Sequence, residues 1–76
     1  MISRNDLLDL FEQGKISGEQ RYQLSWLADK GIDVSAAVTK PLYNRSNIGK
    51  IVKALENGED VTELINACYE EEQNEQ

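Results

Sequence analysis

Few residues in this chain have side chains that could carry out chemistry. Cys68 is the only cysteine, histidine is absent, and 14 of the 76 residues are Asp or Glu. A cysteine nucleophile needs a neighbouring base, and acid–base catalysis commonly uses histidine or carboxylates with separated pKa values. Cys68 falls on an apolar helical stripe, where a packed thiol is the simpler interpretation. We therefore predict that the protein is not an enzyme and uses no cofactor.

The densest carboxylate cluster is Glu70, Glu71 and Glu72. Consecutive side chains point in different directions around a helix, so these three are not expected to converge on one ion. The D-x-D-x-D-G loop of a calcium site is missing, and one cysteine without histidine excludes the usual zinc sites. We predict no metal site and interpret this segment as a solvated acidic end.

Basic residues gather in the middle of the chain. Residues 40–53, KPLYNRSNIGKIVK, contain no acid, although the net charge of the whole chain is −6. Side chains of these types contact phosphates and base edges, and a helix N-terminus is expected within the stretch. One alternative function is therefore a DNA-binding regulator, although DNA-binding domains are typically basic overall. Its candidate nucleic-acid contacts are Lys40, Arg45, Asn47, Lys50 and Lys53.

The C-terminal third is acidic. Residues 54–76 carry eight acids and no basic side chain. A second alternative is an acidic DNA mimic that inhibits a DNA-binding enzyme, although helix caps and a solvated face explain many of these acids more simply. The candidate acidic surface consists of Glu59, Glu63, Glu70, Glu71 and Glu72.

Tyr22 and Trp26 are the candidate protein interface. Their i, i+4 spacing places them on one face of a helix, beside the Leu24–Leu27 stripe. In a small domain such a pair usually covers the edge of the core, and we expect that here. If the pair were exposed, it would be an anchor for a protein partner.

The elements that position these residues are predicted to be helices, because no segment alternates with period two. Ser3 and the Ser17–Gln20 capping box indicate the first two helix starts, and Pro41 prevents the short turn from continuing. Asp60 and Glu63 repeat the capping-box spacing. The expected elements are helices over 4–13 and 18–30, a short turn from Asp33 through Val38, a helix from Asn44 or Ser46 to Gly58, and a last helix from Asp60.

The predicted core follows the helical stripes. Apolar residues recur at i, i+3, i+4 and i+7, most clearly in the last helix. The expected core consists of Leu24, Leu27, Ile48, Ile51, Val52, Leu55, Val61, Leu64, Ile65 and Cys68.

One pattern occurs twice, 27 residues apart: ADKGIDVS at 28–35 and LENGEDVT at 55–62. Its shared features are an acid, a glycine two residues later, then Asp-Val and a hydroxyl residue. We interpret it as a joint at which glycine ends one helix and Asp begins the next. Gly31 and Gly58 should therefore have positive φ. LFEQGKIS at 10–17 is a weaker third copy, and the arrangement indicates a short tandem repeat.

This repeat resembles a short helical repeat of small bacterial and phage or mobile-element proteins, with a consensus near Q-M-x-x-I-x-x-G-L-E-x-G-L-D-V-S-x-Y-A-x-P-x-F. The resemblance covers about residues 19–62. It departs from the consensus at Ala37-Val38, where the family has Tyr-Ala, and the second copy lacks the Pro-aromatic end. The resemblance implies origin and architecture rather than a specific activity. The matching residues are Gln20, Leu24, Asp29, Gly31, Ile32, Asp33, Val34, Ser35, Pro41, Tyr43, Asn47, Ile48, Ile51, Leu55, Glu56, Gly58, Asp60 and Val61.

The sequence thus predicts an all-α protein: a small bundle of four main helices and one short helical turn, built on two helix–joint repeats. Residues 1–69 are expected to form one domain, and 70–76 an acidic tail that frays. No apolar run approaches a membrane span or a signal peptide, so we expect a cytoplasmic protein without a membrane partner. The expected function is binding of another macromolecule, with a protein favoured over nucleic acid. An accessory or inhibitor role follows by analogy with the mobile-element resemblance.

Overall fold

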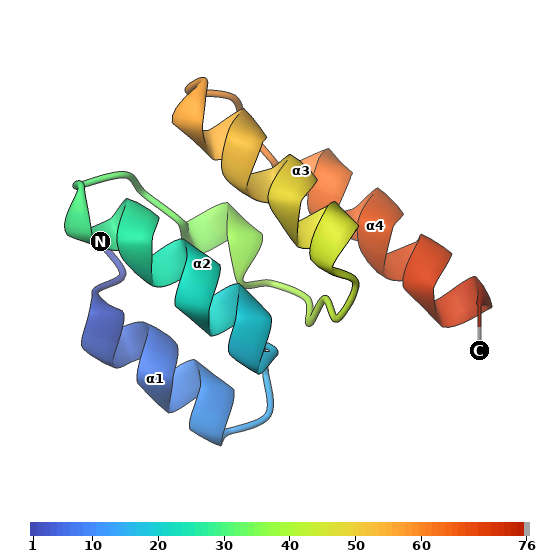
Figure 1. The fold of residues 1–76 in the computed structure, drawn as a ribbon, viewed down its shortest axis with the longest axis horizontal. Helices are drawn as coiled ribbons and strands as arrows, with labels where there is room; N and C mark the ends of the chain where they lie inside the picture. The colour runs from blue at the N-terminus through green and yellow to red at the C-terminus, as the bar shows by residue number, and fades with distance from the viewer. Residues whose placement is uncertain (76) are drawn as a thin grey trace.

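The chain folds into helices joined by short turns (Figure 1). The computed structural model describes residues 1–75, and no strand occurs among them. This confirms the all-α prediction, although the first two helices each end one residue earlier than expected. The elements are α1 (Arg4–Glu12), α2 (Gly18–Asp29), the 3-10 helix η1 (Ser35–Ala37), α3 (Arg45–Glu56) and α4 (Thr62–Asn74).

The first three α-helices begin at capping side chains that the sequence identifies. The hydroxyl oxygen of Ser17 accepts from the Gln20 N–H, while the Gln20 side chain accepts from the Ser17 N–H, both at 3.1 Å. Ser3 forms the same reciprocal box with Asp6. Asn44 is the cap of α3, where its side-chain oxygen accepts from the Asn47 N–H at 3.0 Å. These bonds satisfy backbone donors that a helix start leaves unpaired.

Glycine ends the first three α-helices in the same way. Gly14, Gly31 and Gly58 have φ of 75°, 86° and 78°, so the prediction for the last two is confirmed. In each case the glycine N–H donates to the carbonyl three residues earlier, and the following N–H donates to the carbonyl five residues earlier. This pair of bonds is the Schellman motif, which closes a helix through a left-handed residue.

The two joints that follow Gly31 and Gly58 have matching geometry. Val34 and Val61 share φ −105° and ψ 12°, and neither side chain is exposed. The preceding aspartates accept from the backbone N–H and the hydroxyl two residues on, which belong to Ser35 and Thr62. Asp60 therefore forms a side-chain turn one residue before the cap of α4, and the capping box predicted for it with Glu63 is wrong.

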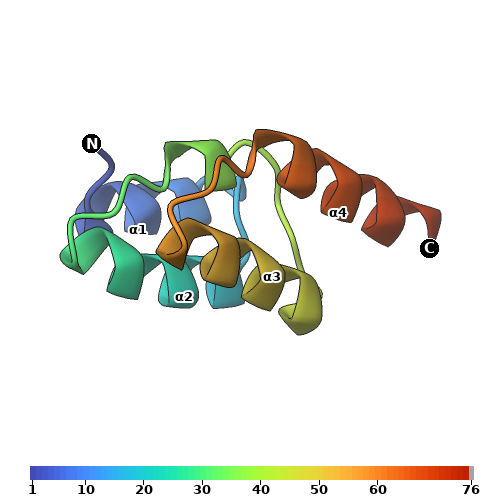
Figure 2. The same ribbon diagram turned by 90° about the horizontal axis from the view of Figure 1, so that it is seen from above.

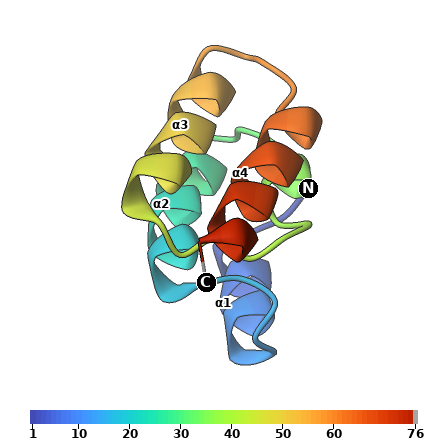
Figure 3. The ribbon, with the colours of Figure 1, turned by 90° about the vertical axis from the view of Figure 1, so that its right-hand side faces the viewer.

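The helices lie in two layers. α2 and α3 form one layer, with α1, η1 and α4 in the other (Figures 2 and 3). Ion pairs join the starts and the ends of α2 and α3, Glu19 to Arg45 and Lys30 to Glu56, so the two helices are parallel. α1 runs antiparallel to α2, because Arg4 at its start meets Asp29 at the end of α2. α4 packs against both η1 and α3.

The core lies between the layers. Most of the predicted core residues are buried, whereas Val52 and Leu64 are only partly buried at its edge. The core also contains apolar residues that were not predicted, which come from α1, from η1, from the loops and from α3. These are Leu7, Ile16, Val34, Ala37, Leu42 and Ala54.

The acidic end differs from its prediction. α4 continues through Asn74, so residues 70–74, expected to fray, are helical, while Gln76 lies outside the described residues. The joint at Asp33 leads only to the short helix η1, because Pro41, which cannot continue a helix, follows it. The joint at Asp60 leads to the long helix α4, because Cys68, 27 residues after Pro41, takes the place of that proline. Within residues 1–75, no helix combines the length and apolar character that crossing a bilayer requires.

Candidate functional site

The basic stretch begins in a segment that a buried glutamine holds against α2. The side-chain nitrogen of Gln20 donates to the carbonyls of Ala37 and Lys40, at 3.0 and 2.9 Å. Its side-chain oxygen accepts from the N–H groups of Leu42 and Ser17, at 2.9 and 3.1 Å. A buried amide with both of its atoms paired in this way fixes the chain from η1 to the start of α3.

A second buried amide lies at the corresponding place in α3. Asn47 is 2% exposed, and its side-chain nitrogen donates to Glu71 and Glu72 of α4, at 3.1 and 3.0 Å. The other oxygen of Glu72, which is also buried, accepts from the Tyr43 N–H at 2.7 Å. The expectation that Glu70–Glu72 form only a solvated end is therefore wrong for Glu72, and two of the three carboxylates converge on one amide.

The predicted nucleic-acid contacts do not form one surface. Asn47 is buried and bonded, so its amide is not presented to a base edge. Arg45 pairs with Glu19 at 3.2 Å, and the ammonium of Lys40 lies 5.3 Å from the centre of the Tyr69 ring. Only Lys50 and Lys53 are exposed on α3 without an ion pair among the described residues.

Lys50 and Lys53 line a hollow between α3 and α4. Its volume is about 310 Å³, and its floor includes Ala54 and Leu64. Asn57 and Glu59 complete the lining. The hollow therefore combines an apolar floor with two ammonium groups and one carboxylate at its rim.

The candidate acidic surface is divided. Glu59 faces the hollow, and Glu72 is buried at the other end of α4. Glu63 and Glu70 are exposed and seven residues apart on α4, so they share a face. Glu71 is exposed, with one oxygen held by Asn47. The five carboxylates thus lie in several different environments rather than in one array.

Tyr22 and Trp26 are both exposed on α2. Tyr22 is 56% exposed and Trp26 54%, so the expectation that they cover the core is wrong. Their rings meet edge to face, with centroids 6.2 Å apart and an angle of 88° between the planes. This is a favourable geometry for two aromatic rings, and each ring limits the motion of the other. The pair is a preformed aromatic surface.

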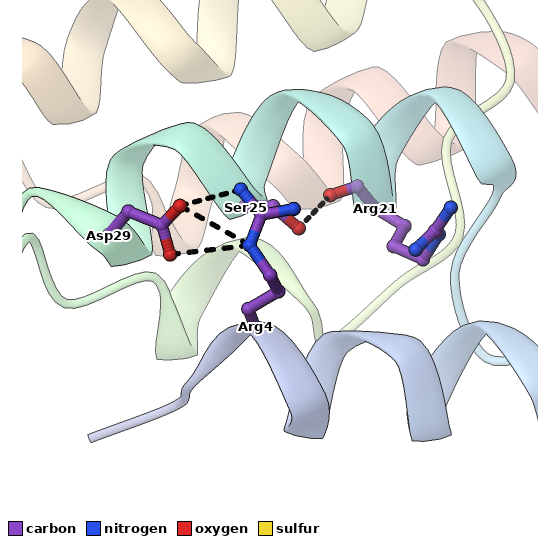
Figure 4. A network of polar contacts seen from close by, with 4 residues as sticks. All are labelled: Arg4, Arg21, Ser25 and Asp29. Carbon is purple, nitrogen blue, oxygen red and sulfur yellow. Dashed lines mark hydrogen bonds and ion pairs between the residues drawn. The ribbon is translucent and has the colours of Figure 1, made fainter.

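Contacts between α1 and α2 hold the helix that carries this pair. Figure 4 shows Arg4 reaching from α1 to the carboxylate of Asp29, where its Nε lies 3.2 Å from one oxygen. Hydrogen bonding to Arg4 lowers the pKa of Asp29. At the other end of the helix pair, the Arg21 guanidinium lies 5.5 Å from the centre of the Phe11 ring. Both ends of α2 are therefore fixed against α1.

Cys68 is packed in the core, as its place on the apolar stripe predicts. Burial raises the pKa of its thiol, which keeps the sulfur protonated and unreactive at neutral pH. No group of three or more Cys, Asp or Glu side chains in residues 1–75 is arranged to hold a metal ion.

The two buried amides and the hollow are not predicted from the sequence. Gln20 and Asn47 are 27 residues apart, and each is the third residue of its helix. An amide side chain that recurs at the same place in both copies of the repeat indicates a structural role for Gln20 and Asn47. Compared with known proteins, the chain matches no family model, no curated protein and no solved structure.

Proposed function

We propose that this protein is a non-enzymatic module that binds another protein, with Tyr22 and Trp26 as the anchor of the interface. The observation that carries the proposal is that both rings are more than half exposed while in contact with each other. Exposed tyrosine and tryptophan side chains dominate the binding energy of many interfaces. A pair already held in one arrangement loses little conformational entropy on binding.

Within this proposal, an accessory or inhibitor role rests only on analogy with the mobile-element repeats that residues 19–62 resemble. Inhibition would follow from occupying a surface that the partner needs, which requires no catalytic group in this chain. The buried, protonated thiol of Cys68 is consistent with such a passive role.

The alternatives that involve DNA receive less support. A DNA-binding surface that includes Asn47 would require its amide to be available, but that amide is buried and donates to Glu71 and Glu72. A phosphate mimic would require a regular row of carboxylates, but Glu59 and Glu72 lie at opposite ends of α4, one in a hollow and one buried.

The test uses Trp26, the single tryptophan, as both probe and target. Proteins retained from a bacterial lysate on the immobilised protein are purified, and their affinity is measured by calorimetry and tryptophan fluorescence. We expect a blue shift of the emission on binding and at least a tenfold loss of affinity in Trp26→Ala. Tyr43→Ala is the matched control, because it removes an exposed aromatic ring outside α2. If Tyr22→Ala and Trp26→Ala bind as tightly as the control, the proposal is wrong.

A further inference from the structure

α3 is the last helix of its layer. α2 contacts α1 and α3, whereas α3 contacts α2 in its own layer and α4 in the other layer (Figures 1 and 3). Within residues 1–75, no helix lies beyond α3 in this layer. The hollow lined by Lys50 and Lys53 occurs on this uncovered side, between α3 and α4.

The molecule itself shows how such an edge is covered. α2 and η1 form a first unit, and α3 and α4 form a second unit that packs on it, α3 on α2 and α4 on η1. In the first unit, Leu27 and Ala37 are buried. Adding 27 to their numbers gives Ala54 and Leu64, the floor of the hollow. By this correspondence, the hollow lies on the second unit at two positions whose counterparts are buried in the first unit.

Polar residues around the hollow follow the same correspondence. Lys30 of the first unit reaches across to Glu56 of the helix packed against it, over 4.0 Å. Its counterpart in the second unit is Asn57, which lines the hollow. One polar position at the hollow therefore corresponds to a residue of the first unit that contacts a parallel helix.

We infer that this hollow binds an amphipathic helix of another protein, lying parallel to α3, with acidic residues beside its apolar stripe. The apolar stripe would cover Ala54 and Leu64. The acids would meet Lys50 and Lys53, which form no ion pair among the described residues. An amphipathic helix in a groove is a common form of recognition, and the two lysines, which outnumber the one carboxylate of Glu59 in the lining, favour an acidic partner. The inference is independent of the Tyr22–Trp26 proposal.

The probe is a synthetic peptide based on α3, the helix that occupies the corresponding edge of the first unit. It spans residues 44–58, with Arg45→Glu and Gly49→Glu. Position 49 lies between Arg45 and Glu56, the two α3 residues that form ion pairs with α2. A glutamate there should therefore face Lys50 and Lys53 when the peptide docks. The control peptide keeps Arg45 and carries Gly49→Lys.

Binding is measured by NMR titration of the isotope-labelled full chain with each peptide. We expect the largest amide shifts at the residues lining the hollow, and at least a tenfold weaker affinity for the basic peptide. Lys50→Glu with Lys53→Glu should also weaken binding of the acidic peptide at least tenfold. Lys15→Glu is the matched control, because Lys15 is exposed in the α1–α2 loop. Trp26→Ala should bind the peptide like the wild type.

Several results would overturn the inference. The first is equal affinity for the two peptides, and the second is a set of shifts centred on another surface. A 15-base-pair DNA duplex that shifts the same amides more strongly would make nucleic acid the ligand. A dimer in sedimentation that the Lys50→Glu, Lys53→Glu variant dissociates would make the occupant a second copy of this chain.

Discussion

The side-chain amide of Asn47 donates to the buried carboxylate of Glu72 over 3.0 Å, and so joins the start of α3 to the end of α4. Glu72 also accepts from the Tyr43 N–H, so one carboxylate pairs two donors that lie 25 and 29 residues away from it in the chain. These two hydrogen bonds satisfy the buried side chain of Glu72, because a buried polar group without a partner is unfavourable. The last turns of α4 therefore belong to the folded domain.

Glu72→Ala should destabilise the protein by about 1–3 kcal/mol, because it leaves the Tyr43 N–H without its acceptor and the buried Asn47 amide with Glu71 alone. The measurement is the free energy of unfolding from denaturant titration. Glu70→Ala, at an exposed position two residues earlier, is the control and should change stability by less than about 0.5 kcal/mol. Equal stabilities for the two variants would mean that the end of α4 is not held by Glu72.

Replacing glycine by alanine should change the stability of the protein in opposite directions at different positions. Gly31 and Gly58 have φ of 86° and 78° with no atom near an added Cβ, so Gly31→Ala and Gly58→Ala should each cost about 1 kcal/mol or more through backbone strain alone. Gly49 lies inside α3 with equally open surroundings, so Gly49→Ala should stabilise the protein by about 0.5–1 kcal/mol. Thermal melts of the three variants test this, and a stabilised Gly31→Ala would contradict it.

The helix starts and joints could be predicted because their causes are local. The caps at Ser17 and Gly31 involve backbone groups within five residues, so residue types and spacing are sufficient to place these helix ends. The repeated Asp-Val-hydroxyl segment could also be predicted from local residue types, although a side-chain turn at Asp60 takes the place of the predicted capping box.

The remaining features depend on contacts between distant segments. Glu72 looks like part of a polar tail until Asn47 and Tyr43 are placed beside it. Trp26 looks like a residue that covers the core, but α1 and α3 pack on α2 so that its ring stays exposed. The hollow at Lys50 exists only because α4 lies against α3. None of these relationships has a signal in residue spacing.

Leucines in the centre and at the edge of the core should differ in their contribution to stability. Leu24 is fully buried between the layers, so Leu24→Ala should cost about 2–5 kcal/mol through lost burial and a residual cavity. Leu64 is only partly buried at the edge of the core, so Leu64→Ala should cost clearly less, contrary to the similar cost that its place in the periodic stripe predicts. Chemical denaturation of both variants gives the comparison. If Leu64→Ala lowered the free energy of unfolding more than Leu24→Ala does, Leu64 would be more deeply buried in solution than in this structure, and the hollow that it lines would be filled.

Acid should destabilise the joints through Asp33 and Asp60. The hydroxyls of Ser35 and Thr62, and then their backbone N–H groups, lower the pKa of these two aspartates below the ordinary value of 3.8. A lowered folded-state pKa means that the ionised form favours folding. This contribution is fully present above the ordinary aspartate pKa and is lost as pH falls through the lowered one.

The Asp33→Asn, Asp60→Asn double variant should therefore lose less stability than the wild type between about pH 5 and about pH 2.5. Its amide oxygens can still accept from the same N–H groups, so the joints should form at neutral pH. The loss of stability in acid should become smaller in the double variant but not disappear, because two other aspartates also have a lowered pKa. Hydrogen bonds from Ser3 lower the pKa of Asp6, and a hydrogen bond from Arg4 lowers that of Asp29. Asp9→Asn is the control, since the Asp9 side chain forms no hydrogen bond or ion pair in residues 1–75. Melting temperatures across this pH range that fall equally in the double variant and the wild type would show that the joints do not depend on these charges.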